Sequence, residues 1–198
     1  MPSETPATFT RQQFLRGFWQ NLAAEVQSVS QSLQGDATRI LLPPGSQSWQ
    51  HLLATCTQCY KCISVCPHEA LRVVREDADH REGYPAIYPL LSACQNCPDM
   101  PCIEACENGT LSYANRHNSS QTLVVDPALC LNGQGHFCMS CVNQCPVGES
   151  ALKLDENGLP EWNTAACTAC GICIQACPAP TNAIKIQLEE APCPSPAS

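Results

Sequence analysis

Cysteine is the residue type in this chain whose spacing points to chemistry, since all but Cys193 of its 17 cysteines fall into dense motifs. Two motifs share one pattern, in which three cysteines lie at two-residue gaps and a fourth follows after three residues and precedes a proline. The first motif is Cys56, Cys59, Cys62 and Cys66, and the fourth is Cys167, Cys170, Cys173 and Cys177. This spacing is one by which proteins hold [4Fe–4S] clusters, so it predicts a cluster at each motif.

Two further motifs keep the three-residue gap before the last cysteine and lengthen one other gap. Residues 98–101 lengthen a gap in the second motif, and residues 131–137 lengthen the first gap of the third. Gly133 and Gly135 give the longer loop the freedom to fold back. We expect a cluster at each of these motifs as well, with Cys94, Cys97, Cys102 and Cys106 as ligands in the second and Cys130, Cys138, Cys141 and Cys145 in the third.

The spacing matches the chemistry of a cubane better than that of other cysteine sites. Three cysteines at short intervals wrap one loop around three irons, and the N–H groups of the loop then point toward the sulfides. Zinc also uses C-x₂-C pairs, but it needs two pairs separated by a spacer, which leaves the later cysteines of each motif without a role. Disulfides are disfavoured in a reducing compartment, and the spacing of [2Fe–2S] sites is absent. Cys193 is predicted to be a free thiol.

The last cysteine of such a motif reaches a neighbouring cluster, so the motifs must work in pairs. We favour a nested arrangement, which pairs the two regular motifs with each other and the two irregular motifs with each other. Cys177 then completes the set of the first motif and Cys66 that of the fourth, while Cys145 completes the second and Cys106 the third. Sequential pairing, first motif with second and third with fourth, remains the alternative.

Composition and charge narrow the range of functions. The formal net charge is −8, which disfavours binding to nucleic acid and favours docking on a basic face of a protein. No run of about 20 apolar residues is present, so no membrane span is expected. No phosphate loop, nucleophile elbow or paired-carboxylate motif stands out, which argues against an enzyme with chemistry of its own. The expected partner is a redox enzyme or a membrane-bound electron donor.

The remaining elements are short, apart from one helix near the N-terminus. Apolar residues at spacings of three and four predict an amphipathic helix that packs on the cluster body or docks on a partner; they are Leu15, Trp19, Leu22, Val26, Val29 and Leu33. The Pro-Pro-Gly sequence at 43–45 indicates a linker. We expect residues 1–50 to form the helix and linker, 51–188 the cluster domain, and 189–198 a disordered tail rich in Pro and Ser.

Short apolar runs follow the cysteine motifs and predict a repeating strand, turn and strand. The runs occupy residues 70–74, 84–88, 110–113, 123–125, 151–154, 159–162 and 183–186, with an Asn-Gly turn signal at 157–158. The expected fold is α+β. It consists of two joined dicluster units like bacterial ferredoxins, with short β-hairpins and short helices around the clusters and the amphipathic helix at the N-terminus.

These motifs resemble those of the polyferredoxins, and in particular the ferredoxin-type accessory proteins encoded with periplasmic nitrate reductase and with methylamine utilisation. The resemblance covers roughly residues 39–187. It rests on the order of the motifs, on Leu42-Pro43-Pro44-Gly45, on Cys97-Pro98-Asp99-Met100-Pro101-Cys102 and on Cys130-Leu131-Asn132-Gly133-Gln134-Gly135. It implies four [4Fe–4S] clusters bound by the motif cysteines. It also implies electron transfer to or from a partner redox enzyme, or, as the alternative, a role in the assembly of a molybdenum or other redox enzyme.

One branch of this group is exported by the twin-arginine route, and another stays in the cytoplasm. Residues 10–16 read TRQQFLR, with Gln12 where the export signal has its second arginine. The segment that follows is too polar for the apolar region of a leader. We therefore expect the protein to be cytoplasmic.

Overall fold

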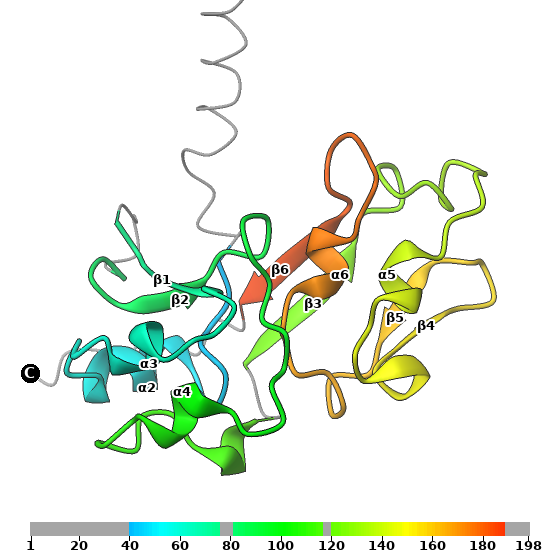
Figure 1. The fold of residues 1–198 in the computed structure, drawn as a ribbon. Coiled ribbons are helices and arrows are strands. Elements are labelled where there is room, and N and C mark those ends of the chain that lie inside the picture. Colours follow the sequence, from blue (N-terminus) through cyan, green and yellow to red (C-terminus); the bar gives the residue numbers. More distant parts are fainter. Residues whose placement is uncertain (1–39, 76–80, 117–119, 189–198) are drawn as a thin grey trace, which may run out of the picture. The chain divides into compact units, whose positions relative to one another are not determined.

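The computed structural model describes residues 40–75, 81–116 and 120–188 (Figure 1). The chain divides into two units, Met1–Asp36 and Ala37–Ser198, and all described residues belong to the second. The predicted amphipathic helix, the export-like residues 10–16 and the tail with Cys193 lie outside the described residues. Within the described ranges, no helix has the length and apolar character needed to cross a membrane.

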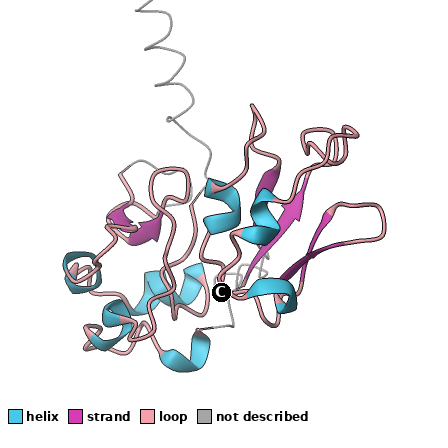
Figure 2. Ribbon diagram, turned by 45° about the vertical axis from the view of Figure 1, so that its right-hand side comes forward, coloured by secondary structure: helices cyan, strands magenta, loops and turns pink. Residues whose placement is uncertain are grey.

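Each cysteine motif contributes a single turn of helix, and most of the other described residues form loops (Figure 2). These turns are α3 (Lys61–Ser64), α4 (Pro101–Glu104), α5 (Ser140–Asn143) and α6 (Ile172–Gln175). Helix α2 (Trp49–Thr55) precedes the first motif, and the Ser48 hydroxyl accepts a hydrogen bond from the His51 N–H at 3.1 Å, which caps its N-terminus. Helices this short are marginal alone, so tertiary packing must stabilise them.

The strands form antiparallel pairs, and two of the pairs are the predicted hairpins. Strand β1 (Leu71–Val73) pairs with β2 (Pro85–Ile87), and β4 (Leu152–Leu154) pairs with β5 (Pro160–Trp162). The turn between β4 and β5 uses the Asn-Gly signal, and Gly158 has a φ of +77°, which glycine adopts without strain. Each hairpin lies between two cysteine motifs, so it returns the chain from one motif to the next.

The third strand pair differs from the predicted repeat. Strand β3 (Gln121–Val125) pairs with β6 (Ile184–Leu188), which lies beyond the fourth motif. The predicted strand at residues 110–113 is not formed. Instead the Leu111 N–H donates to the Cys106 sulfur at 3.3 Å, and a turn of 3₁₀ helix, η2 (Tyr113–Asn115), follows. A second such turn, η3 (Gly148–Ser150), precedes β4.

The described residues form a first half (residues 40–116) and a second half (residues 120–188), which share one hydrophobic core. Leu41, Leu52 and Ile87 of the first half belong to it, as do Leu152 and Ile174 of the second. Figure 1 shows the hairpin β1–β2 with α2, α3 and α4 in the first half, and the other strands with α5 and α6 in the second. In the first half, the buried guanidinium of Arg81 also lies 4.9 Å from the centroid of the Trp49 ring, a cation–π contact.

The segment predicted as a linker is part of this core, so that prediction is wrong. Leu41 is fully buried and exchanges two backbone hydrogen bonds with Ile87, at 2.9 and 2.8 Å. Gly45 has a φ of +80°, and a Cβ at this position would lie 2.8 Å from the Ser112 carbonyl oxygen. The Pro-Pro-Gly sequence therefore shapes a buried turn, in which no side chain larger than glycine fits.

Candidate metal centres

The motif cysteines line four cavities, each of which is surrounded by four of them. We number each site after the motif that supplies three of its cysteines. Site I has Cys56, Cys59, Cys62 and Cys106, and site II has Cys66, Cys94, Cys97 and Cys102. Site III has Cys130, Cys138, Cys141 and Cys177, and site IV has Cys145, Cys167, Cys170 and Cys173. The cavities are similar in size and in their mainly apolar lining, which favours one kind of occupant for all of them.

The nested pairing favoured above is wrong, and the sequential alternative is the one the structure shows. Cys106 lies with the first motif and Cys66 with the second, while Cys177 lies with the third and Cys145 with the fourth. The physical reason is the hairpin between each pair of motifs. Because β1 and β2 run antiparallel, the chain that leaves the first motif comes back beside it at the second, and β4 and β5 do the same in the second half.

The short helices explain how one motif serves two sites. In the first motif, α3 carries Cys62 into site I and ends just before Cys66 of site II. In the second motif, α4 carries Cys102 into site II and ends just before Cys106 of site I. Helices α5 and α6 repeat this exchange between sites III and IV. One helical turn thus sends the last two cysteines of a motif to different cavities.

The loops at sites I, II and IV use the same local conformation. The second residue after the first cysteine is left-handed in each, with φ of 54° at Gln58, 53° at Asn96 and 50° at Ala169. A left-handed residue other than glycine costs free energy and is expected where function requires it. In each loop this residue donates its N–H to the sulfur of the first cysteine, at 3.4, 3.5 and 3.4 Å. The strained backbone therefore points a donor at the sulfur, as stabilisation of a thiolate requires.

The long loop of site III uses a side chain in place of this backbone turn. The Asn132 amide nitrogen donates to the carbonyl oxygens of Cys138 and Gly158, both at 2.7 Å. Its amide oxygen accepts the N–H of Cys138, also at 2.7 Å. Gly133 comes so close to the chain that a Cβ there would lie 2.1 Å from the Pro127 carbonyl oxygen. Sequence reasoning recognised the glycines but missed Asn132, whose position two residues after Cys130 was the available signal.

Burial raises the pKa values of several motif cysteines, and this affects what the sites can bind. Burial, together with the neighbouring Cys56 and Cys106, raises the pKa of Cys62 to about 12. Burial also raises the pKa of Cys94 to about 12 and the pKa values of Cys102 and Cys141 to about 11. A raised pKa favours the protonated thiol unless positive charge nearby compensates a thiolate. Iron bound at these cysteines would supply that charge, and its binding would release the protons.

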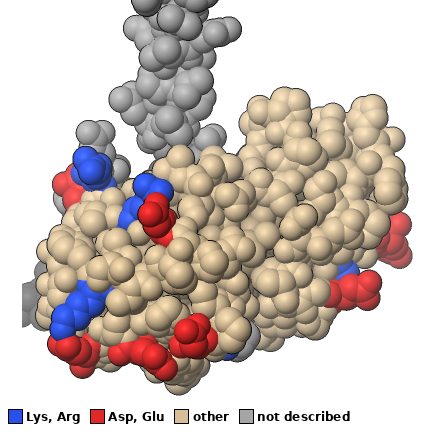
Figure 3. Space-filling model, viewed as in Figure 1, with Lys and Arg blue, Asp and Glu red and all other residues tan. Residues whose placement is uncertain are grey.

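Charge is distributed unevenly around the four sites. No Asp, Glu, Lys or Arg occurs at residues 127–148 or 162–184, which include every ligand of sites III and IV. In the first half, the loops of sites I and II carry Lys61, Asp99, Glu104 and Glu107. Figure 3 shows this contrast, with charged side chains along the first half and a broad uncharged face on the second. At site IV the Ala169 N–H, which donates to the Cys167 sulfur, would help to offset the negative charge of a cluster.

The donor set fits [4Fe–4S] clusters. In the part of the chain that the structure describes, no three His, Cys, Asp or Glu side chains converge as ligands of one metal ion would. The four thiols of each site instead stand around a cavity lined mainly by apolar residues, with N–H groups directed at several of the sulfurs. The paired motifs and the hairpins between them define an iron–sulfur protein of the ferredoxin type.

Comparison with known proteins agrees with this class. A model described as a 4Fe-4S dicluster domain matches residues 122–178, and one described as a 4Fe-4S binding domain matches residues 53–72. The dicluster match contains the third and fourth motifs together, as sequential pairing requires. No solved structure matches the chain.

The relatives are ferredoxin-type proteins. The methylamine utilization ferredoxin-type protein MauM of Paracoccus denitrificans is 31% identical, over 87% of this chain and 79% of its own length. The ferredoxin-type protein NapG of Haemophilus influenzae is also 31% identical, but the match covers 79% of this chain and only 61% of that protein. The ferredoxin-type protein NapF of Escherichia coli is 26% identical, over 72% of this chain and 82% of its own length. This chain belongs to the family of ferredoxin-type electron-transfer proteins that includes MauM and NapG.

Proposed function

We propose that the chain holds four [4Fe–4S] clusters and relays electrons to or from a partner redox enzyme. The observation that carries this proposal is the completeness of the sites, since each of the four cavities has four cysteines around it. A [4Fe–4S] cluster accepts and releases one electron at a time. The thiols bind it, the loop N–H groups offset its negative charge, and burial limits the access of water.

The protein is proposed to be an electron carrier or accessory subunit without a reaction of its own. Three kinds of feature support this role: the cysteine sites, the acidic composition and the ferredoxin-type relatives. The relative MauM is named for methylamine utilization. For this chain the proposal extends only to a redox enzyme or membrane-bound electron donor with a basic docking face. A cytoplasmic location is part of the proposal and rests on Gln12 in the export-like segment.

The docking face is proposed to be the acidic edge of the first half. Asp99 lies just before α4, which supplies a ligand to site II, and Glu104 is the last residue of that helix. Glu107 pairs with Lys61 beside site I. The Tyr113 hydroxyl donates to the Asp99 carbonyl oxygen at 2.6 Å and fixes that loop. An anionic edge beside two sites favours a basic partner and makes association weaker at high salt. The N-terminal segment is the other proposed contact.

The test is anaerobic iron and sulfide analysis together with EPR of the reduced protein. About sixteen iron and sixteen sulfide per chain are expected for four cubanes. About eight iron, or zinc in place of iron, would refute the proposed cofactor set. For the partner, the Glu104→Gln variant should weaken association at low salt, while the control Glu156→Gln in the second half should not. Equal effects of both variants would refute the acidic edge as the docking face.

A further inference from the structure

The two halves meet at the loops that carry ligands of sites II and IV. The N–H of Cys94, a ligand of site II, donates to the carbonyl oxygen of Cys170, a ligand of site IV, at 2.9 Å. The next residue, Gly171, has a φ of +82°. A Cβ there would lie 2.7 Å from the Pro89 Cβ and 2.8 Å from the Leu41 Cδ1. The halves therefore meet at a glycine, where the side chains of Pro89 and Leu41 leave no room for a Cβ.

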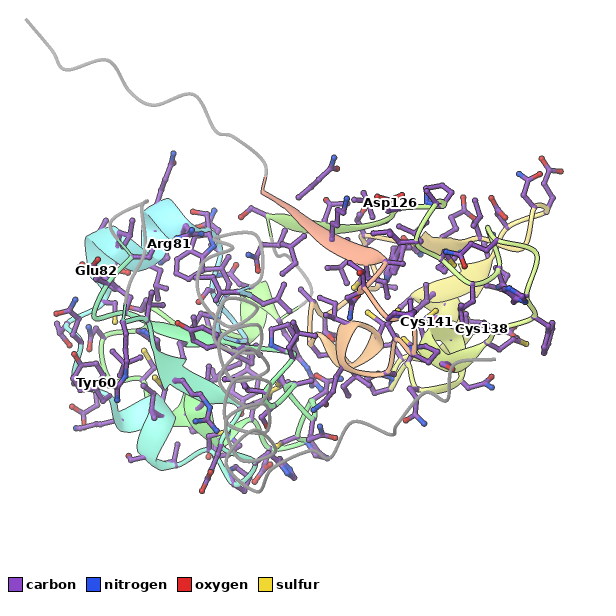
Figure 4. The ribbon with its side chains drawn as sticks, turned by 90° about the horizontal axis from the view of Figure 1, so that it is seen from above. Tyr60, Arg81, Glu82, Asp126, Cys138 and Cys141 are labelled. Carbon is purple, nitrogen blue, oxygen red and sulfur yellow. The ribbon has the colours of Figure 1, made fainter. Side chains whose placement is uncertain are left out.

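Sites I and III lie away from this contact. In the first half, α3 and α4 join site I to site II, and in the second, α5 and α6 join site III to site IV. Figure 4 shows Tyr60, which lies between two ligands of site I, at one end of the described residues, and Cys138 and Cys141 of site III at the other. Cys59 of site I is exposed, and Phe137, next to Cys138, is 88% exposed. Both outer sites thus lie close to solvent.

From this placement we infer that the four sites form a single line in the order I, II, IV, III, with the crossing between halves at the hydrogen bond from Cys94 to Cys170. The order differs from that of the motifs along the chain, because the second half is joined to the first through its fourth motif. The inference rests on the proposed cluster content. The path between sites II and IV consists of the covalent bonds within Cys94 and Cys170 and the one hydrogen bond between them. A single electron passes there from one site to the other, and no bond forms or breaks.

Magnetic coupling between pairs of reduced clusters tests the order without any partner enzyme. The double variant Cys59→Ala, Cys138→Ala leaves only sites II and IV complete, whereas Cys97→Ala, Cys167→Ala leaves only sites I and III complete. After reduction with dithionite, the first should show EPR signals broadened by spin–spin interaction and fast spin relaxation. The second should show two independent signals. Coupling in the second variant that equals or exceeds coupling in the first would overturn the line.

Two glycine substitutions, one a test and one a control, probe the contact between the halves. Gly171→Ala places a methyl group against Pro89 and Leu41, so it should weaken the coupling between halves. Gly148→Ala is the matched control, because Gly148 has a φ of +75° and nothing within 4 Å of an added Cβ. It imposes similar backbone strain and should leave the coupling unchanged. If Gly171→Ala does not fold, the double variants, which keep Gly171, still decide the order.

The outcomes separate this inference from the proposed function. The unaltered chain could hold about sixteen iron while the first double variant shows no coupling between sites II and IV. This result would refute the order I, II, IV, III and would leave the proposed cluster content unaffected. An unaltered chain that loads only one half would refute the proposed function, and the line would fall with it.

Discussion

Replacing Gln121 by methionine should destabilise the described body by about 1–3 kcal/mol, the cost of a buried donor left without a partner. The side chain is only 5% exposed, and its amide oxygen accepts the Leu42 N–H at 2.7 Å. Its amide nitrogen donates to the Ile40 carbonyl oxygen at 3.4 Å. These bonds tie the buried segment of the first half to β3 of the second. Methionine has a similar length but can neither accept from Leu42 nor donate to Ile40.

The assay is an anaerobic guanidinium titration of the loaded protein, followed by the visible absorption of the clusters. For a loss of about 2 kcal/mol and a denaturant slope of roughly 4 kcal/mol/M, the midpoint should fall by about 0.5 M. Because cluster loss is irreversible, all variants must be compared after the same incubation time. Hydrogen exchange at the Leu42 amide gives a second readout and should become faster.

The matched control is Gln187→Met, which makes the same change at an exposed position on β6, the strand paired with β3. It should leave the midpoint within the scatter of surface substitutions, about ±0.5 kcal/mol. A Gln121→Met midpoint equal to that of the control, with unchanged exchange at Leu42, would refute the argument that Gln121 joins the halves.

Three further predictions concern single residues. Cys66→Ala should remove the EPR signal of site II and leave that of site IV, because Cys66 lies with the second motif; loss of the site IV signal instead would restore nesting. Asn132→Ala should speed iron release to a chelator from site III alone, while Asn143→Ala, exposed on α5, should not; uniform release from all sites would contradict the role of Asn132. The hydrogen bond from Lys185 lowers the pKa of Asp126, so the stabilisation by this carboxylate is present above its unfolded pKa and is lost as pH falls through the lower folded pKa. In Lys185→Met the folded pKa of Asp126 should be higher, so less stabilisation is lost and the loss is complete at a higher pH; carboxyl ¹³C shifts of Asp126 that titrate identically in both proteins would disprove it.

Sequence alone predicts the parts of this molecule that depend on short-range order. The structure brings the motif cysteines together in sets of four, and the hairpins β1–β2 and β4–β5 form where alternating apolar runs and turn signals place them. Binding of clusters at these sets stays a prediction. The turn at Gly158 was readable because an Asn-Gly pair has few other conformations that suit a hairpin.

Two of the three failures concern contacts between distant segments. Which two motifs share their cysteines depends on where the hairpin between them places the second motif. Nested pairing was inferred from the regular spacing of two motifs, and that spacing says nothing about where a hairpin places a motif. Residues 110–113 have the composition of a strand. The Leu111 N–H donates to the Cys106 sulfur, however, and so cannot donate to a neighbouring strand. Leu41 reads as part of a linker because of the prolines that follow, yet Ile87 buries it. A partner far along the chain thus decides the motif pairing and the burial of Leu41, whereas the strand at 110–113 is lost to a sulfur only five residues away.

Sequential pairing has a consequence for how the protein is made. Every ligand of sites I and II has left the ribosome once Cys106 emerges, before any cysteine of the third motif emerges. Chains fold from the N-terminus as they are synthesised, so the first half has its complete ligand set while the second is still being made. A nested chain would expose unfilled thiols until Cys177 appeared. The interlocked pairs thus shorten the time during which nascent cysteines stand open to oxidation or to the wrong metal.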